Sequence, residues 1–444
     1  MKNMIKYVKT YLILIIIFLL CLTITSLIPS KLMKSNVQKS ANTLKRMGPI
    51  SKYIDYELVD LILFRYTDAL MINTAYSIDS ETPLYSFMVA RRNYLPKLTK
   101  KIYSEDLYDL SSIQKYYKEN KLESGDIRRV ADQVNELYDT AYDDIEESVE
   151  YARYWHGYLC FLRPLLVIFD YNAIMVLSTI IFAIILSVFT YLMSKRTSFL
   201  QTIPFLIGFI LVGGFIVSMS MNEITCFYIA YIASIYILLK FDKIKNMNLI
   251  FFIIGAVTNF IDFFTNPIIT LGIPMLVYTT VLQKEKELTL KQTIIQYIKS
   301  ILSWGIGFSV TWISKWVIVD ILYNKGILKN AITQALFRSV SYGLKEKVTF
   351  EGALFNSLSF LGIIPIMFII LIPLVYVFIP IKRHNANINK GLPYILISLM
   401  PFLWMIILTN HTAEHPWFTC RNFYITITGI QLLLISQIKI AKKK

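Results

Sequence analysis

Long apolar runs alternate with polar stretches along the chain. The first run, Tyr11–Ile28, has no charge over a length that can cross the roughly 30 Å hydrocarbon layer of a bilayer. Comparable runs follow at 172–193, 201–219, 225–239, 248–263, 268–282, 300–322, 358–380, 391–408 and 423–438. Because every backbone amide in lipid needs a partner within its own segment, we expect each run to be a helix. The pattern predicts an all-α integral membrane protein with about ten transmembrane helices.

Three of these runs allow a second interpretation. The runs 248–263 and 268–282 are short and almost continuous, so they form either two thin spans or one re-entrant pair. The first run follows several lysines, as a signal peptide does, but it has the length of a true span and no small-x-small cleavage site follows it. We therefore expect an uncleaved anchor.

The charged residues are few and unevenly placed. They make up 17% of the chain, against about a quarter in soluble proteins, and the formal net charge is +15. The excess cations lie in both termini and in alternate connections, near 195, 240–245, 284–299 and 382–390. The positive-inside rule therefore predicts a cell-membrane protein with both termini in the cytoplasm. No basic helix with interleaved aromatic residues indicates nucleic acid as a partner, and the Lys-, Ile- and Asn-rich usage suits a bacterium.

The apolar runs and the polar connections between them divide the chain into five consecutive parts. The first is a cytoplasmic tail with the first span, and a large external loop with membrane-lying helices follows it. Spans two to seven, a second external loop, and the last three spans with their own external loop and a basic tail complete the layout. The corresponding ranges are 1–29, 30–170, 171–322, 323–357 and 358–444, with the last external loop at 409–422.

The external parts contain apolar residues at helical spacing. One stripe predicts an amphipathic helix that lies on the membrane or on the bundle: Val130, Val134, Leu137, Ala141, Ile145, Val149 and Ala152. The region 55–76 predicts a second amphipathic helix near the lipid surface, and 331–344 predicts an interfacial helix.

Ionisable residues gather at the predicted external ends of the spans, where such groups commonly mark function. The candidates are Asp55, Asp68, Asp262, Arg153, His156, Arg163, Lys315, His411 and Arg421. Several have a structural alternative. Lys315 either extends to the outer headgroups along its own stem or lines a polar cavity. Asp262 either acts on a substrate or caps a broken helix, Asp68 is either catalytic or a solvated carboxylate, and 154–157 is either part of a site or an aromatic-belt anchor.

The segment His411-x-x-Glu414-His415 has the form of an inverted zinc-protease motif. Pro416 disfavours a helix at His415, and no acidic residue follows Glu414 to complete a metal site. We expect instead a non-helical loop that presents His411 and Arg421 to an anionic group. The sequence requires no cofactor and leaves room for a divalent cation held by acids of the first external loop.

The layout of the chain resembles that of the GT-C superfamily of membrane glycosyltransferases. It consists of a short tail, a first span, a large helical external loop and then a bundle of spans. The resemblance covers most of the chain, and the segments 152–158, 162–165, 262–274 and 410–421 look like those of an envelope-polysaccharide subgroup. It implies transfer of a sugar from a polyprenyl-phosphate carrier to a polysaccharide or glycolipid on the external face. The Asp-x-Asp pair that many members carry after the first span is replaced here by Asp55-Tyr-Glu57, followed by Asp60 and Asp68.

The chemistry of this transfer suggests roles for the candidates. A carboxylate must take the proton of the acceptor hydroxyl, and cations must stabilise the departing phosphate. Asp68 is the first choice for the base, ahead of Asp55 and Asp262. For the phosphate we expect Arg421, Arg163, Arg153 and Lys315, with His156 and His411 as hydrogen-bonding partners. A transporter or flippase for a lipid-linked saccharide, a polysaccharide polymerase, and a purely structural or regulatory membrane protein remain as alternatives, although no internal repeat of the kind common in transporters is visible.

Overall fold

The computed structural model describes residues 2–47, 59–93, 133–142, 148–262, 264–285, 289–339, 348–378 and 388–437. Asp55 lies outside these residues. Within them the chain is almost entirely helical, and the exception is a two-stranded antiparallel sheet that pairs Arg91–Asn93 (β1) with Ser148–Glu150 (β2). The prediction of an all-α membrane protein is therefore confirmed at the level of fold class.

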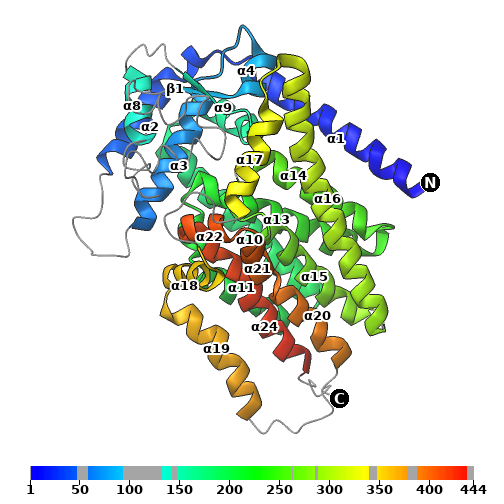
Figure 1. The fold of residues 1–444 in the computed structure, drawn as a ribbon. Coiled ribbons are helices and arrows are strands. Elements are labelled where there is room, and N and C mark those ends of the chain that lie inside the picture. The colour runs from blue at the N-terminus through cyan, green and yellow to red at the C-terminus, as the bar shows by residue number, and fades with distance from the viewer. Residues whose placement is uncertain are drawn as a thin grey trace.

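Short elements gather at one end of a bundle of longer helices, as Figure 1 shows at its top. The short elements comprise η1 (Ser30–Met33), α2 (Lys34–Arg46), α3 (Val59–Tyr76), α4 (Pro83–Val89), α8 (Gln133–Tyr142), α9 (Leu159–Ile168) and α17 (Ile327–Ser339). The bundle comprises α1 (Lys2–Ser26), α10 (Tyr171–Arg196), α11 (Phe199–Leu211), α12 (Gly214–Val217), α13 (Met221–Lys240), η4 (Phe241–Lys243), α14 (Met247–Ile261), α15 (Ile269–Glu285), α16 (Leu290–Tyr323), α18 (Phe350–Leu361), α19 (Ile363–Phe378), α20 (Ile388–Ser398), α21 (Met400–Ile407), α22 (Thr409–Glu414), α23 (Pro416–Thr419), η5 (Cys420–Asn422) and α24 (Phe423–Gln437).

Six helical segments among the described residues are long and apolar enough to cross a membrane. They are Met4–Ser26, Tyr171–Arg196, Met221–Lys243, Leu290–Tyr323, Lys390–Ile407 and Pro416–Gln437, and the pair Phe350–Leu361 and Ile363–Leu371, bent by 110°, passes the same test together. The chain is thus a multi-pass membrane protein. The expected total of about ten spans depends on the shorter helices α11, α14 and α15 and stays a prediction.

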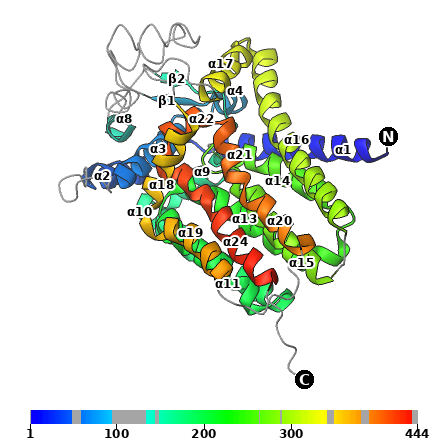
Figure 2. The ribbon, with the colours of Figure 1, turned by 60° about the horizontal axis from the view of Figure 1, so that its bottom comes forward.

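Side-chain contacts define a basic end of the bundle, formed by residues 195–199, 240–248, 283–285, 289–299 and 390. Arg196 lies 2.6 Å from both Asp242 and Glu285, and Lys284 donates to the carbonyl of Arg196 at 2.8 Å. The opposite end, which we call the polar end, consists of the first turns of α10, α13 and α24 and the last turn of α14. The short elements cover this polar end, and the C-terminal helix leads away from it (Figure 2).

Helices α14 and α15 each connect the two ends of the bundle. At the basic end, Asn248 near the start of α14 accepts a hydrogen bond from Gln296. Glu285, the last residue of α15, lies beside Arg196 at the same end. At the polar end, the turn between the two helices contacts Thr225 in the first turns of α13. A re-entrant pair would return before reaching the other end, so this geometry favours two thin spans.

All three of the predicted external helices differ from expectation in some respect. The stripe over 130–152 is not one helix, because α8 ends at Tyr142 and Val149 lies in strand β2. The apolar alternation around Val149 fits a strand as well as a helix, and pairing with β1 satisfies its backbone. The position of helix α3 was predicted correctly. Its C-terminal half is not amphipathic, however, because residues 69–75 are all buried. The interfacial helix begins at Ile327 rather than at 331.

Helix α16 is longer than its apolar run and packs closely on α14. It begins at Leu290 because Thr289 and Gln292 form a capping box ahead of the apolar residues. Two glycines allow the two helices to approach: a Cβ on Gly255 would lie 2.1 Å from the carbonyl oxygen of Trp304, and one on Gly307 would lie 2.1 Å from that of Phe252. Small residues at such crossings are typical of membrane helices.

The crossing of α14 and α16 gives a test of this packing. Gly307→Val should force the two helices apart and lower the free energy of unfolding by about 1–3 kcal/mol, as overpacking usually does. Gly305→Val is the matched control, because a Cβ at Gly305 meets nothing within 4 Å among the described residues. Thermal unfolding in detergent measures both variants, and equal melting temperatures for the two would contradict the close approach.

Candidate functional site

Asp68 joins the short elements to the bundle at the polar end. Its side chain on α3 is fully buried and accepts a hydrogen bond from the hydroxyl of Tyr171 at 2.9 Å. It also accepts from the backbone N–H groups of Met221 and Asn222, each at 3.2 Å. The first N–H groups of a helix have no partner within the helix and carry partial positive charge. The start of α13 is therefore a binding site for the Asp68 carboxylate.

Burial changes the acidity of this group. Asp68 lies on α3, which is not one of the membrane-crossing segments. Burial of its side chain raises the pKa of Asp68 to about 7, although hydrogen bonds from Tyr171 and the α13 backbone oppose the rise. A carboxyl group with a pKa near neutrality can both accept and release a proton at physiological pH, which is what a general base requires.

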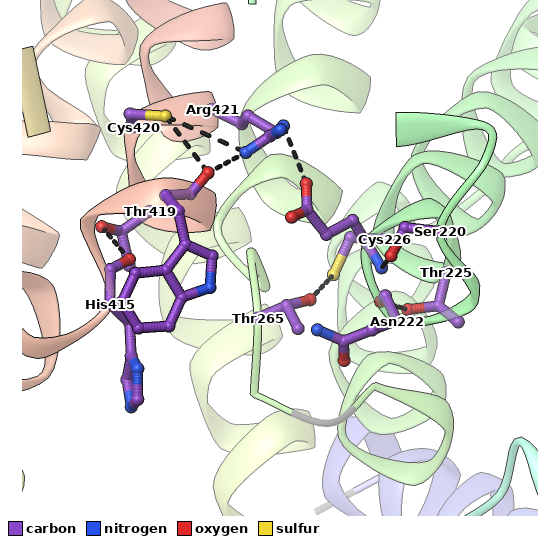
Figure 3. Close-up of polar contacts among 11 residues, drawn as sticks. Ser220, Asn222, Thr225, Cys226, Thr265, His415, Thr419, Cys420 and Arg421 are labelled. Atoms are coloured by element: carbon purple, nitrogen blue, oxygen red, sulfur yellow. Dashed lines mark hydrogen bonds and ion pairs between the residues drawn. The ribbon is translucent and has the colours of Figure 1, made fainter. Parts of the chain in front are cut away.

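A buried ion pair lies one residue further along α13. Nε of Arg421, in η5, is 2.7 Å from a carboxylate oxygen of Glu223, and the exposed fractions of the two side chains are 3% and 0%. Figure 3 shows the arginine reaching from the C-terminal region to the first turn of α13, with its guanidinium also donating to the carbonyl of Trp417. The sequence gave no sign that Glu223 is the partner of Arg421.

Asp262 completes the group of carboxylates around α13. It follows the last residue of α14 and accepts from the backbone N–H of Thr265 at 2.9 Å and from its hydroxyl at 2.6 Å. The hydroxyl of Thr225, on α13, also contacts it at 3.4 Å. These contacts are those of a cap on the turn between α14 and α15, where Phe264 has a positive φ of 64°. The capping alternative for Asp262 therefore accounts for its geometry.

Several amides lie near these charges without partners. The side chains of Asn266 and Asn422 are fully buried, and neither the amide nitrogen nor the oxygen of either has a hydrogen-bond partner among the described residues. The side-chain oxygens of Asn222 and Asn259 share this property. Buried polar groups are nearly always hydrogen-bonded, so these amides require a polar ligand or ordered water. Sequence reasoning missed Asn422; its position at the start of the last apolar run was the only available signal.

Two predicted phosphate-binding cations have backbone partners instead. Arg163 is fully buried in α9 and donates to the carbonyls of Thr25, Ile28 and Ala75, at the C-terminal ends of α1 and α3. Lys315, also fully buried, donates to the carbonyls of Phe87 and Met88 at the end of α4. Lys315 is therefore held inside the protein and does not extend to the headgroups. Both cations bind carbonyls that the helices leave unpaired.

Arg153 and His156 lie close together in the segment before α9, beside α16. Arg153 donates to the side-chain oxygen of Asn330 at 3.1 Å, and its own carbonyl accepts from the indoles of Trp312 and Trp316. A ring nitrogen of His156 is 2.8 Å from the carbonyl of Tyr151. Burial, together with the charges of Lys315 and Arg153, lowers the pKa of His156 to about 3, so its ring is neutral at physiological pH.

The segment 154–157 is therefore part of the protein interior and not an aromatic-belt anchor. Trp155 is fully buried and donates to the carbonyl of Thr311, and the ring of Tyr154 stacks on Trp312. An anchor in the aromatic belt would instead expose its ring at the headgroup level.

The predicted non-helical loop around His411 is partly wrong. Residues 409–414 form the short helix α22, because the backbone of His415 still bonds back to His411. The helix ends at Glu414, and His415 leaves helical geometry before Pro416, as proline requires. The two imidazole rings lie 4.8 Å apart beside Phe264 and Phe418. Among the described residues no group of three or more His, Cys, Asp or Glu could hold a metal ion.

Comparison with protein-family models, with curated proteins and with solved structures gives no match to this chain.

The ion pair between Glu223 and Arg421 can be tested by stability. Glu223→Gln leaves the Arg421 charge buried without its counter-ion and should lower the free energy of unfolding by about 3–5 kcal/mol. Arg421→Gln alone should be similarly costly, whereas the double variant removes both charges and should recover part of the loss. Thermal unfolding of the four proteins measures the coupling, and strictly additive losses would contradict a direct pair.

The pKa of Asp68 predicts a pH dependence of folding. Between about pH 4 and 7 the folded protein binds a proton at Asp68 more tightly than the unfolded chain, so this contribution to stability falls as the pH rises to about 7. From pH 5 to pH 8, the melting temperature of Asp68→Asn should therefore rise relative to that of the wild type. The exposed Asp79 supplies the control variant Asp79→Asn, which should follow the wild-type profile.

Proposed function

We propose that the chain is a membrane glycosyltransferase that moves a sugar from a polyprenyl-phosphate carrier to a cell-envelope polysaccharide or glycolipid. The layout resembles the GT-C superfamily, and one observation carries the proposal. Asp68, a carboxyl group with a pKa near 7, is held at the start of α13 within one residue of the Glu223–Arg421 pair. A candidate base and a candidate phosphate ligand thus meet at one end of the membrane-crossing helices.

The proposed side of the membrane follows from the charges. The lysines and arginines of the basic end lie opposite the polar end, and cytoplasmic connections are rich in such residues. The polar end then faces outward, and both termini lie in the cytoplasm, as expected for a bacterial cell membrane. Lipid-linked sugars present their phosphate at the membrane surface, which is the level at which α10, α13 and α24 begin.

Each group in the site has a role in this reaction. The Asp68 carboxylate takes the proton from the acceptor hydroxyl while that oxygen bonds to the anomeric carbon of the sugar and the carrier phosphate departs. The planar fork of Arg421 binds phosphate oxygens, and the phosphate replaces Glu223 as its partner. The buried amides of Asn266 and Asn422 bind sugar hydroxyls. Because Asp68 is fully buried, the acceptor reaches it only when α3 moves away from α13.

The placement of the site favours an enzyme over a transporter. Transporters commonly bind their substrate near the midplane, between structural repeats. Here the carboxylates and Arg421 lie at the ends of the helices, and the sequence shows no repeat. A polymerase would act on similar lipid-linked substrates, so the products must separate these possibilities.

The proposed base is tested by activity. Transfer of sugar from a polyprenyl-phosphate donor by protein in vesicles should fall about a hundredfold or more in Asp68→Asn, the usual range for a general base. In the wild type, activity should fall as the pH drops below about 7, because Asp68 becomes protonated. Asp79→Asn should keep full activity. A fully active, correctly folded Asp68→Asn protein would exclude Asp68 as the base.

Deleting the protein from the cell separates the three functions. Loss of one side sugar from the surface polysaccharide indicates a transferase, which is the result we expect. Accumulation of single lipid-linked repeats indicates a polymerase, and accumulation of lipid-linked saccharide on the cytoplasmic face indicates a transporter. Either of the last two results would overturn the proposal.

A further inference from the structure

A cavity of about 660 Å³ opens at the basic end of the bundle, far from the candidate site. Three lysines from different parts of the chain line it: Lys6 from α1, Lys245 from the connection before α14, and Lys299 from α16. No acidic residue is among the described residues of its lining. Three ammonium groups around one cavity repel one another unless an anion lies between them.

The neutral groups of this cavity also favour an anion. The side-chain oxygen of Asn248 already accepts hydrogen bonds from Gln296 at 2.9 Å and Ser300 at 3.0 Å, so its amide nitrogen remains as a donor. The hydroxyls of Tyr7 and Ser303 are further donors in the lining. The N-terminus of α14, with its partial positive charge, begins at the same place.

Nearby carboxylates do not neutralise these lysines. Asp242 and Glu285, at the same end of the bundle, both lie 2.6 Å from Arg196. Among the described residues, none of Lys6, Lys245 and Lys299 forms an ion pair within 4.0 Å. The positive charge of the cavity is therefore uncompensated by the described part of the protein.

We propose that this cavity binds a phosphate group, and that the headgroup of an anionic phospholipid supplies it. Basic pockets between transmembrane helices at the cytoplasmic side are suited to such headgroups. The cavity lies between α1, α14 and α16, where a lipid of the adjacent leaflet can place its phosphate among the lysines. A bound headgroup would add to the contacts that Tyr7 and Tyr11, in the N-terminal half of α1, already make with α14 and α16. This proposal does not depend on the proposed sugar transfer.

The test uses the full chain in nanodiscs of phosphatidylcholine, with and without phosphatidylglycerol. Native mass spectrometry measures the phosphatidylglycerol that the protein retains, and thermal unfolding measures the stabilisation that it gives. The wild type should retain this lipid and melt at a higher temperature in its presence. The triple variant Lys6→Ala, Lys245→Ala, Lys299→Ala should bind it at least about tenfold more weakly, because each lysine near the surface attracts the headgroup.

The controls keep the result interpretable. The triple variant Lys240→Ala, Lys243→Ala, Lys291→Ala removes the same charge from the same end but outside the cavity lining, and it should bind like the wild type. If the first triple variant does not fold, Lys299→Ala alone and the charge-preserving Lys299→Arg replace it, with weaker binding expected only in the former. Equal losses in both triple variants would overturn the cavity as the site. Stabilisation by inorganic phosphate but not by phosphatidylglycerol would overturn the lipid as the source.

Discussion

Charged side chains at the polar end bind the backbone groups that helices leave unpaired, and the arrangement of the short elements depends on this pairing. Asp68 accepts from the first N–H groups of α13, and Asp320 accepts from those of α17 at 2.6 and 2.9 Å. Arg163 and Lys315 donate to the last carbonyls of α1, α3 and α4. Near lipid, an unpaired backbone group is costly, and a charge matched to the helix dipole satisfies it. The short elements are therefore attached to the bundle through helix ends.

The same pairing explains why the candidate chemistry lies at the start of α13. A helix N-terminus attracts carboxylates, and here it binds Asp68. In the same region Glu223 pairs with Arg421, and Asp262 caps the turn between α14 and α15. Burial keeps the pKa of Asp68 near neutrality. In the proposed reaction, the carrier phosphate replaces Glu223 as the partner of Arg421. The attachment of the short elements and the proposed reaction therefore both depend on charged side chains that are held at helix ends and shielded from bulk water.

The apolar runs were sufficient to predict the fold class and the position of most long helices. They could not predict where helices end, because α16 begins at a capping box ahead of its apolar run, and the stripe through Val149 fits a strand as well as a helix. For the site, the sequence singled out the ionisable residues but not their partners. It could not distinguish Arg421, which pairs with a side chain, from Arg163, which pairs with carbonyls, since that difference depends on contacts between residues far apart in the chain.

Labelling of single cysteines tests most directly whether the basic and polar ends lie on opposite sides of the membrane, with the polar end outside. In a chain whose four native cysteines are replaced, one cysteine is placed at Asp79, in the exposed turn after α3, or at Lys243, at the basic end. A membrane-impermeant maleimide should label position 79 in intact cells and position 243 only after the cells are opened. The reverse pattern, or labelling of both positions from outside, would contradict the account.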